Sequence, residues 1–383
     1  MTKHIKHLAL GLSLALVLSA CSQAPDQEKN EQEAPVAQTI EKDAPASPDN
    51  TPPSDQEAPT SEEAEKLEAM EAAAQSFTAT LTDDVPPANA LVAYKEMIPH
   101  MKPGDLSIEF IKLEKHLIKW SMKYTDRLYS ERGIQELIPA LNQSVQWPEG
   151  ILDLDLVDNQ DLKDELSEMI DGAIKFVWLE GSPYPIVDYG KLEGLKESLI
   201  PPLAAYVELA ALESNEVSVH DAGIVIPWND LSDRLMKAEE VLRDIDGSAI
   251  LIEEKVRLAY MQYFDFYTLG LSNTPVVDWN SYKVQKEVLD SYHRFMETYP
   301  ESASAKQLMA YLALLQDHDY KIPYGDQDQF SAFMAKLEAL KTAAIEELQS
   351  GHTHSHDHDQ DHEHENPLEM DLEQPAEDTG GKD

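Results

Sequence analysis

The sequence predicts an all-α protein: a multi-helix domain of packed helix pairs, flanked by a disordered N-terminal tether and a disordered C-terminal tail. Apolar residues in the middle of the chain recur mostly at three- and four-residue spacing, which is typical of amphipathic helices. All five tryptophans lie between residues 61 and 350. The few strand-like runs, 186–187 and 223–226, are short and lie beside proline.

Residues 1–20 have the pattern of a secretory signal peptide. Two lysines precede an apolar run from Leu8 to Val17, which is too short for a bilayer span of roughly 20 residues. The run ends in Leu18-Ser19-Ala20-Cys21, which resembles the lipobox of bacterial lipoproteins at all four positions. That resemblance implies cleavage before Cys21, diacylglycerol on its sulfur and an acyl chain such as palmitate on the new amino terminus.

Cys21 is the only cysteine in the chain, which excludes an intramolecular disulfide and a multi-cysteine zinc site. Once it is acylated, it is also excluded as a nucleophile. The expected partner is the lipid bilayer, and the expected location is the extracytoplasmic side of a cell membrane or outer membrane. Ser22 after the cysteine resembles sorted lipoproteins, which favours the outer membrane where a cell has one. An ordinary secretory signal with a chance cysteine is the alternative.

Residues 21–60 form the predicted acidic tether. They are rich in Pro, Glu, Asp, Gln, Ala and Ser and contain no aromatic residue. Such a segment cannot bury enough apolar area to offset the entropy lost on ordering. Residues 22–75 carry a net charge of −11, and like charges extend a linker.

Residues 61–350 form the predicted helical domain. Ser61 is the candidate cap of its first helix, and Asn229 and Ser248 are candidate caps further along. The aromatic run from Tyr260 to Tyr267 is expected to belong to the core rather than to a ligand groove. The other helices are expected at 104–132, 134–143, 160–179, 191–200, 203–214, 229–245, 248–269, 283–298, 302–316 and 327–349.

Two helix pairs near the end of this domain have similar turns. Residues 241–248 align with residues 295–302 at an offset of 54. The second turn, Tyr299-Pro300-Glu301-Ser302 followed by Ala305, resembles the Tyr-Pro-x-Ser-x-x-Ala turn of tetratricopeptide-like helical repeats. The resemblance implies helix–turn–helix geometry, and stacked pairs would offer a concave surface to a peptide or protein. The offset is longer than that family's period, so no regular array is expected.

Residues 351–383 form the predicted His-rich acidic tail. Imidazole is a preferred ligand of Zn²⁺, Cu²⁺ and Ni²⁺, and carboxylates supplement it. The tail resembles the His-rich segments of zinc-uptake binding lipoproteins, although the rest of the chain lacks the strands of those two-lobed α/β proteins. A tail that only solvates the protein is the alternative. Six of the 13 histidines of the chain are the predicted metal ligands: His352, His354, His356, His358, His362 and His364.

The net charge of −42 makes nucleic acid an unsuitable partner, because an acidic surface repels phosphates. The chain contains no His-Glu-x-x-His, no Gly-rich phosphate loop and no Gly-x-Ser-x-Gly, so we expect no enzymatic activity. The remaining histidines are weaker candidates for a site or are expected to be structural: His293 with Glu297, His318 between Asp317 and Asp319, His220 with Asp221, His116 and His100.

The sequence therefore predicts an extracytoplasmic lipoprotein with a helical interaction domain and a tail that captures or buffers divalent metal. Two alternatives stay open. One is a helical scaffold or adaptor that binds an envelope protein or peptide and has no metal role. The other is an envelope hydrolase that uses acidic residues, because paired carboxylates are not recognisable from one sequence.

Overall fold

The computed structural model describes residues 61–146, 151–179, 181–245 and 250–350. Twelve α-helices account for most of this part of the chain, so the all-α prediction is confirmed. In chain order they are α2 (Ser61–Thr80), α3 (Pro87–Met97), α4 (Pro103–Leu128), α5 (Ile138–Ser144), α6 (Gln160–Asp171), α7 (Tyr189–Leu192), α8 (Pro201–Asn215), α9 (Trp228–Asp244), α10 (Ile250–Leu269), α11 (Lys286–Thr298), α12 (Ala303–Asp317) and α13 (Gln327–Ser350).

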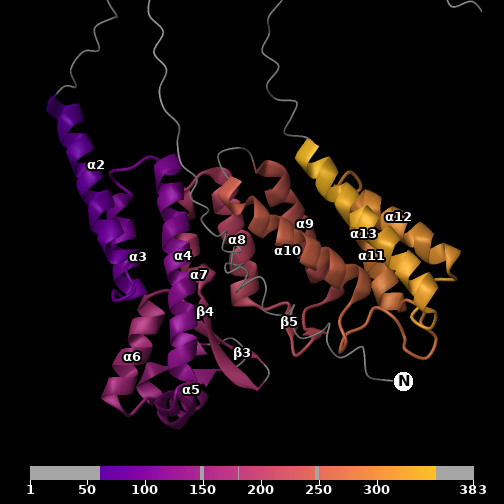
Figure 1. The fold of residues 1–383 in the computed structure, drawn as a ribbon, viewed down its shortest axis with the longest axis horizontal. Coiled ribbons are helices and arrows are strands. Elements are labelled where there is room, and N and C mark those ends of the chain that lie inside the picture. Colours follow the sequence, from indigo (N-terminus) through magenta and orange to yellow (C-terminus); the bar gives the residue numbers. More distant parts are fainter. Residues whose placement is uncertain (1–60, 147–150, 180, 246–249, 351–383) are drawn as a thin grey trace, which may run out of the picture.

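The helices form a curved series in which chain neighbours pack side by side (Figure 1). At one end α3 lies between α2 and α4, and α6 packs below them. In the middle α8 and α10 both contact α9. At the other end α11 and α13 flank α12. Proline occupies the first turn of α3, α4 and α8. Proline lacks a backbone N–H, and in the first turn an N–H would have no acceptor within the helix, so no hydrogen bond is lost.

A hairpin interrupts the helices and corrects one prediction. The helix expected over 160–179 ends at Asp171, and residues Ile174–Leu179 form strand β3 instead. Ala173 takes a left-handed φ of 56°, which breaks the helix, and the Ile-Lys-Phe-Val-Trp-Leu sequence that follows favours a strand. β3 pairs antiparallel with β4 (Ser182–Val187), and β4 contains the strand-like run expected at 186–187.

Two shorter ladders and three irregular helices complete the described elements. They are β1 (Val145–Gln146) with β2 (Ile151–Leu152), β5 (Val219–His220) with β6 (Gly223–Ile224), a π-helical turn at Gly133–Leu137, and 3₁₀ turns at Leu154–Leu156 and Glu193–Ser198. The helix expected at 191–200 is therefore the single turn of α7 followed by 3₁₀ structure. Asn229 does not cap α9, because the helix already begins at Trp228, after Pro227. Ser248 lies outside the described residues.

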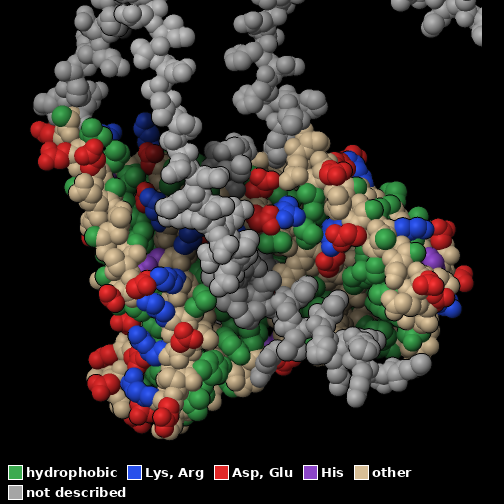
Figure 2. All heavy atoms as spheres, viewed as in Figure 1, with side chains coloured by type: hydrophobic (Ala, Val, Ile, Leu, Met, Phe, Trp, Pro, Cys, Tyr) green, Lys and Arg blue, Asp and Glu red, His purple; other side chains and the backbone are tan. Residues whose placement is uncertain are grey.

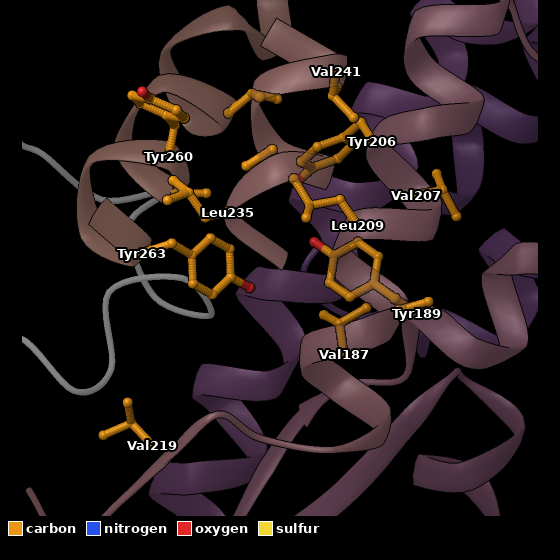
Figure 3. Packing of buried hydrophobic residues seen from close by; sticks show 14 of the residues in the cluster. Val187, Tyr189, Tyr206, Val207, Leu209, Val219, Leu235, Val241, Tyr260 and Tyr263 are labelled. Carbon is orange, nitrogen blue, oxygen red and sulfur yellow. The ribbon is translucent and has the colours of Figure 1, made fainter. Parts of the chain in front are cut away.

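One continuous apolar core runs through the described helices. Figure 3 shows part of it, with Tyr189, Tyr206 and Tyr263 among Leu and Val side chains. The aromatic run from Tyr260 to Tyr267 belongs to this core, as predicted: its Tyr and Phe side chains are all buried. The two predicted helix–turn–helix pairs are α9–α10 and α11–α12.

The first residue of α2 and the last residue of α13 lie on the same side of the molecule (Figure 1). No helix in the described ranges combines the length and the apolar composition that a bilayer crossing requires.

Candidate functional site

The two groups of residues to which the sequence assigns chemistry cannot be placed. Cys21 and the six tail histidines lie outside the described residues, so lipidation and metal binding by the tail stay predictions. Within the ranges that the structure describes, no group of three or more His, Cys, Asp or Glu side chains is arranged to hold a metal ion.

The histidines of the helical domain are scattered. His293 and Glu297 are both exposed on α11, and His100 is exposed after α3. The His318 ring lies 5.8 Å from the Phe333 ring, and His220 Nδ1 lies 3.3 Å from the Asp221 carboxylate. The structure brings none of these histidines together into one site.

His116 differs from the others because α4 buries it. Burial lowers the pKa of His116, and its Nε2 has no hydrogen-bond partner. Trp120, one turn later, likewise has a buried indole N–H without a partner. The His116 and Trp120 rings lie 6.2 Å apart. His116 was expected to be a structural histidine, and it is buried, but one of its ring nitrogens has no hydrogen-bond partner.

Three buried glutamates have hydrogen-bond donors from the chain itself. The fully buried carboxylate of Glu114 on α4 accepts hydrogen bonds from Tyr189 at 2.6 Å and from Tyr206, and it is ion-paired with Lys255 of α10. Burial, followed by the Glu114 charge, raises the pKa of Tyr189 and of Tyr206 well above the ordinary value. This network ties together α4, α7, α8 and α10.

The other two glutamates join elements in the same way. Glu213 accepts hydrogen bonds from Ser218 and Tyr263 and pairs with Arg234 at 2.8 Å. Glu239 of α9 accepts hydrogen bonds from two backbone N–H groups at the start of α12, those of Ala303 and Ser304, both at 2.8 Å. These carboxylates connect helices that are distant in sequence.

Four aromatic residues, one exposed and three half-buried, lie together where two loops and the start of α13 meet. They are Trp279, Tyr282, Tyr324 and Phe330, which we call the aromatic surface. The Trp279 ring lies 5.3 Å from that of Tyr324 and 6.4 Å from that of Tyr282, and Tyr324 lies 5.1 Å from Phe330. Trp279 is 51% exposed, and it is the only tryptophan classed as exposed in the described ranges.

Backbone hydrogen bonds fix the loop that carries Trp279. Asp278 N–H donates to Lys283 O at 2.9 Å, and Tyr282 N–H donates to Asp278 O at 2.7 Å, which closes a turn with Trp279 near its tip. The Asp278 carboxylate accepts bonds from the hydroxyl and the N–H of Ser281, both at 2.9 Å. Those bonds lower the pKa of Asp278.

A second set of bonds joins this loop to residues 318–326, between α12 and α13. Val284 N–H donates to Tyr320 O at 2.9 Å, and Ile322 N–H donates to Tyr282 O at 3.1 Å. Tyr282, Asp319 and Tyr320 all take left-handed φ values, 58°, 56° and 59°. Such a backbone costs on the order of 1–3 kcal/mol per residue and is concentrated at functional sites in proteins. The two loops that surround Trp279 are therefore held in a defined conformation, with the backbone strain at Tyr282, Asp319 and Tyr320.

Comparison with known proteins identifies no relative: no protein-family model, no curated protein and no solved structure matches the chain. The aromatic surface was not predicted from the sequence. The available signal was Asp278-Trp279-Asn280-Ser281, an aromatic residue among turn-forming residues in a gap between two helical patterns.

Proposed function

We propose that this protein is a lipid-anchored extracytoplasmic protein whose helical domain binds a partner and whose His-rich tail binds divalent metal ions. The observation that carries the proposal is the sequence pattern at the two ends. The lone cysteine falls at the last position of a lipobox, and six histidines fall within 13 residues of the tail.

The anchor follows from the energetics of acyl chains. One chain holds a protein at a membrane only marginally, whereas the two or three chains implied at Cys21 hold it stably. Substitution Cys21→Ala should therefore release the protein from the membrane fraction. Protein that stays in that fraction and incorporates no labelled palmitate in either form would contradict the anchor.

The tail supplies imidazole and carboxylate ligands without a fixed geometry. We expect several histidines to bind one Zn²⁺ with modest affinity and little selectivity over Ni²⁺ or Cu²⁺. Metal binding requires neutral imidazole, so the tail should release zinc as the pH falls through about 6.

Isothermal titration tests the tail directly. Zinc should bind the protein at about pH 7.5, where imidazole is neutral, and truncation after Ser350 should remove that binding. The matched control is a tail of unchanged length and charge in which the six histidines are glutamine. An unchanged zinc stoichiometry in either variant would refute the metal role.

A scaffold or adaptor without a metal role is the second candidate, and the aromatic surface favours it. An exposed tryptophan on a fixed loop is a typical anchor of protein interfaces. Zinc titration separates the two candidates, because the scaffold alone predicts a tail that binds no metal.

A further inference from the structure

We infer that the aromatic surface binds a positively charged segment of a partner protein, with an arginine or lysine side chain stacked on the face of Trp279. This inference rests on the proposed interaction role of the helical domain and adds the place and the chemistry of the contact. The occupant we assign is a cationic peptide segment rather than a nucleic acid, a lipid or the chain's own tether.

The first argument comes from how this chain covers its other aromatic rings. On α4, Lys123 lies 4.6 Å from the centre of the Trp120 ring, and Arg127 lies 5.3 Å from that of Tyr124. Trp120 is only 5% exposed. Trp279 is ten times more exposed, and no cation of the described residues stacks on it. A partner can supply the cation that the chain supplies elsewhere.

The second argument is charge. Residues 76–350 carry a net charge of −23, and acidic side chains are spread over the face shown in Figure 2. The two loops, 270–285 and 318–326, and the start of α13 contain two lysines, Lys283 and Lys321, and four aspartates: Asp278, Asp319, Asp326 and Asp328. None of these four aspartates has an ion-pair partner in the described part of the chain. A cationic partner is therefore attracted over long range and meets carboxylates at the surface.

The same charge excludes the other occupants. Phosphates of nucleic acids and anionic lipid headgroups would be repelled. The tether is rich in proline, which aromatic surfaces can bind, but residues 22–75 carry a net charge of −11. The tail carries −10. Both terminal segments are thus poor occupants of an acidic surface.

The third argument is preorganisation. Hydrogen bonds within 278–283 and between the two loops fix Trp279, so little conformational entropy is lost when a partner binds. Exposure of the large Trp279 ring to water brings no folding stability to the free protein. Both features agree with a prebuilt anchor for a partner.

The test uses the tryptophan indole signals of the full mature chain in ¹H–¹⁵N correlation spectra. The probe is a capped peptide of alternating arginine and glycine, and its control is the same peptide with citrulline, the neutral isostere of arginine. Trp279→Phe identifies the Trp279 signal. The arginine peptide should move that signal and leave those of Trp120 and Trp228 in place, with about tenfold weaker binding of the citrulline peptide.

Fluorescence polarisation of the labelled arginine peptide gives a second readout. Trp279→Ala should weaken binding about tenfold, whereas Val92→Ala, an exposed apolar residue on the distant helix α3, should not change it. An unchanged affinity of the Trp279→Ala chain, or equal shifts with both peptides, would overturn the inference. A Trp279 shift caused by a neutral trimer of N-acetylglucosamine but not by the arginine peptide would overturn it in favour of a glycan site.

Failure of this inference is distinguishable from failure of the proposed metal role. Zinc titration of the Trp279→Ala chain reports only on the tail, and peptide binding in the absence of zinc reports only on the helical domain. Peptide binding without zinc binding would support the inference and refute the metal role.

Discussion

The residue Glu114 joins four helices through one carboxylate. It is fully buried, and its two oxygens receive two tyrosine hydroxyls and the ammonium of Lys255, which is itself 24% exposed at its side chain. A buried ion pair adds little net stability compared with a well-packed apolar pair, but removal of one partner leaves an uncompensated buried charge. The loss of stability on substitution therefore depends on whether a charged Glu114 or a charged Lys255 is left without its partner.

Substitution Glu114→Gln should lower the free energy of unfolding by about 2–4 kcal/mol, because Lys255 loses its counter-charge while the amide oxygen still accepts a tyrosine bond. Denaturant unfolding measures this cost. In a Lys255→Met background the same substitution should cost at least about 1 kcal/mol less, since no cation is left unpaired. Equal costs in both backgrounds would show that the ion pair does not determine the loss.

At the scale of elements, the start of α12 has two independent caps. The Ser302 hydroxyl accepts a hydrogen bond from Ala305 N–H at 3.0 Å. Glu239 of α9 accepts hydrogen bonds from the buried N–H groups of Ala303 and Ser304, the first two residues of α12. Together they satisfy three of the donors that every helix N-terminus leaves unpaired.

Substitution Ser302→Ala should cost about 1 kcal/mol, the usual value for loss of a cap. Glu239→Ala should cost about 3 kcal/mol, because it leaves two buried N–H groups without a charged acceptor. Guanidinium unfolding curves of the two variants compare these costs, with Glu239→Gln, which keeps one oxygen acceptor, as the intermediate control. A larger loss for Ser302→Ala would contradict this ranking.

Most helix positions were predictable because local periodicity indicates them, as the 24-residue helix α13 shows. Three features were not predictable. The β3–β4 hairpin depends on a left-handed residue, Ala173, in an otherwise helical pattern. Glu239 acts on a helix more than sixty residues away along the chain. Trp279 lies beside Tyr324 only because two loops, 270–285 and 318–326, come together. Each depends on tertiary contacts that one-dimensional spacing does not encode.

At the scale of the whole molecule, tyrosine links the core to the backbone. Seven tyrosines are among the largest fully buried side chains. Their hydroxyls donate to backbone oxygens or face other polar groups: Tyr94 donates to Leu106 O at 3.0 Å, and Tyr292 and Tyr311 donate to Tyr267 O and Thr268 O, both at 2.7 Å. A core of this kind stays stable only while the phenols are neutral.

This core predicts unfolding in alkali. Burial raises the pKa of Tyr267 to about 12 and also raises the pKa of Tyr292 and Tyr263. Because the folded-state values are the higher ones, the stabilisation is fully present below about pH 10 and is lost as the pH rises toward the folded values. Tyrosinate absorbance and helix circular dichroism should therefore change together above pH 10. Gradual ionisation at full helicity would contradict the prediction.

The helix α13 also separates the aromatic surface from the residue at which the His-rich tail begins. Its 24 residues span roughly 36 Å, with Phe330 of the aromatic surface near one end and Ser350, where the His-rich tail begins, at the other. The chain enters α2 and leaves α13 on one side of the body. If Cys21 is acylated as proposed, the tether to the membrane and the His-rich tail would therefore both join the body on that side.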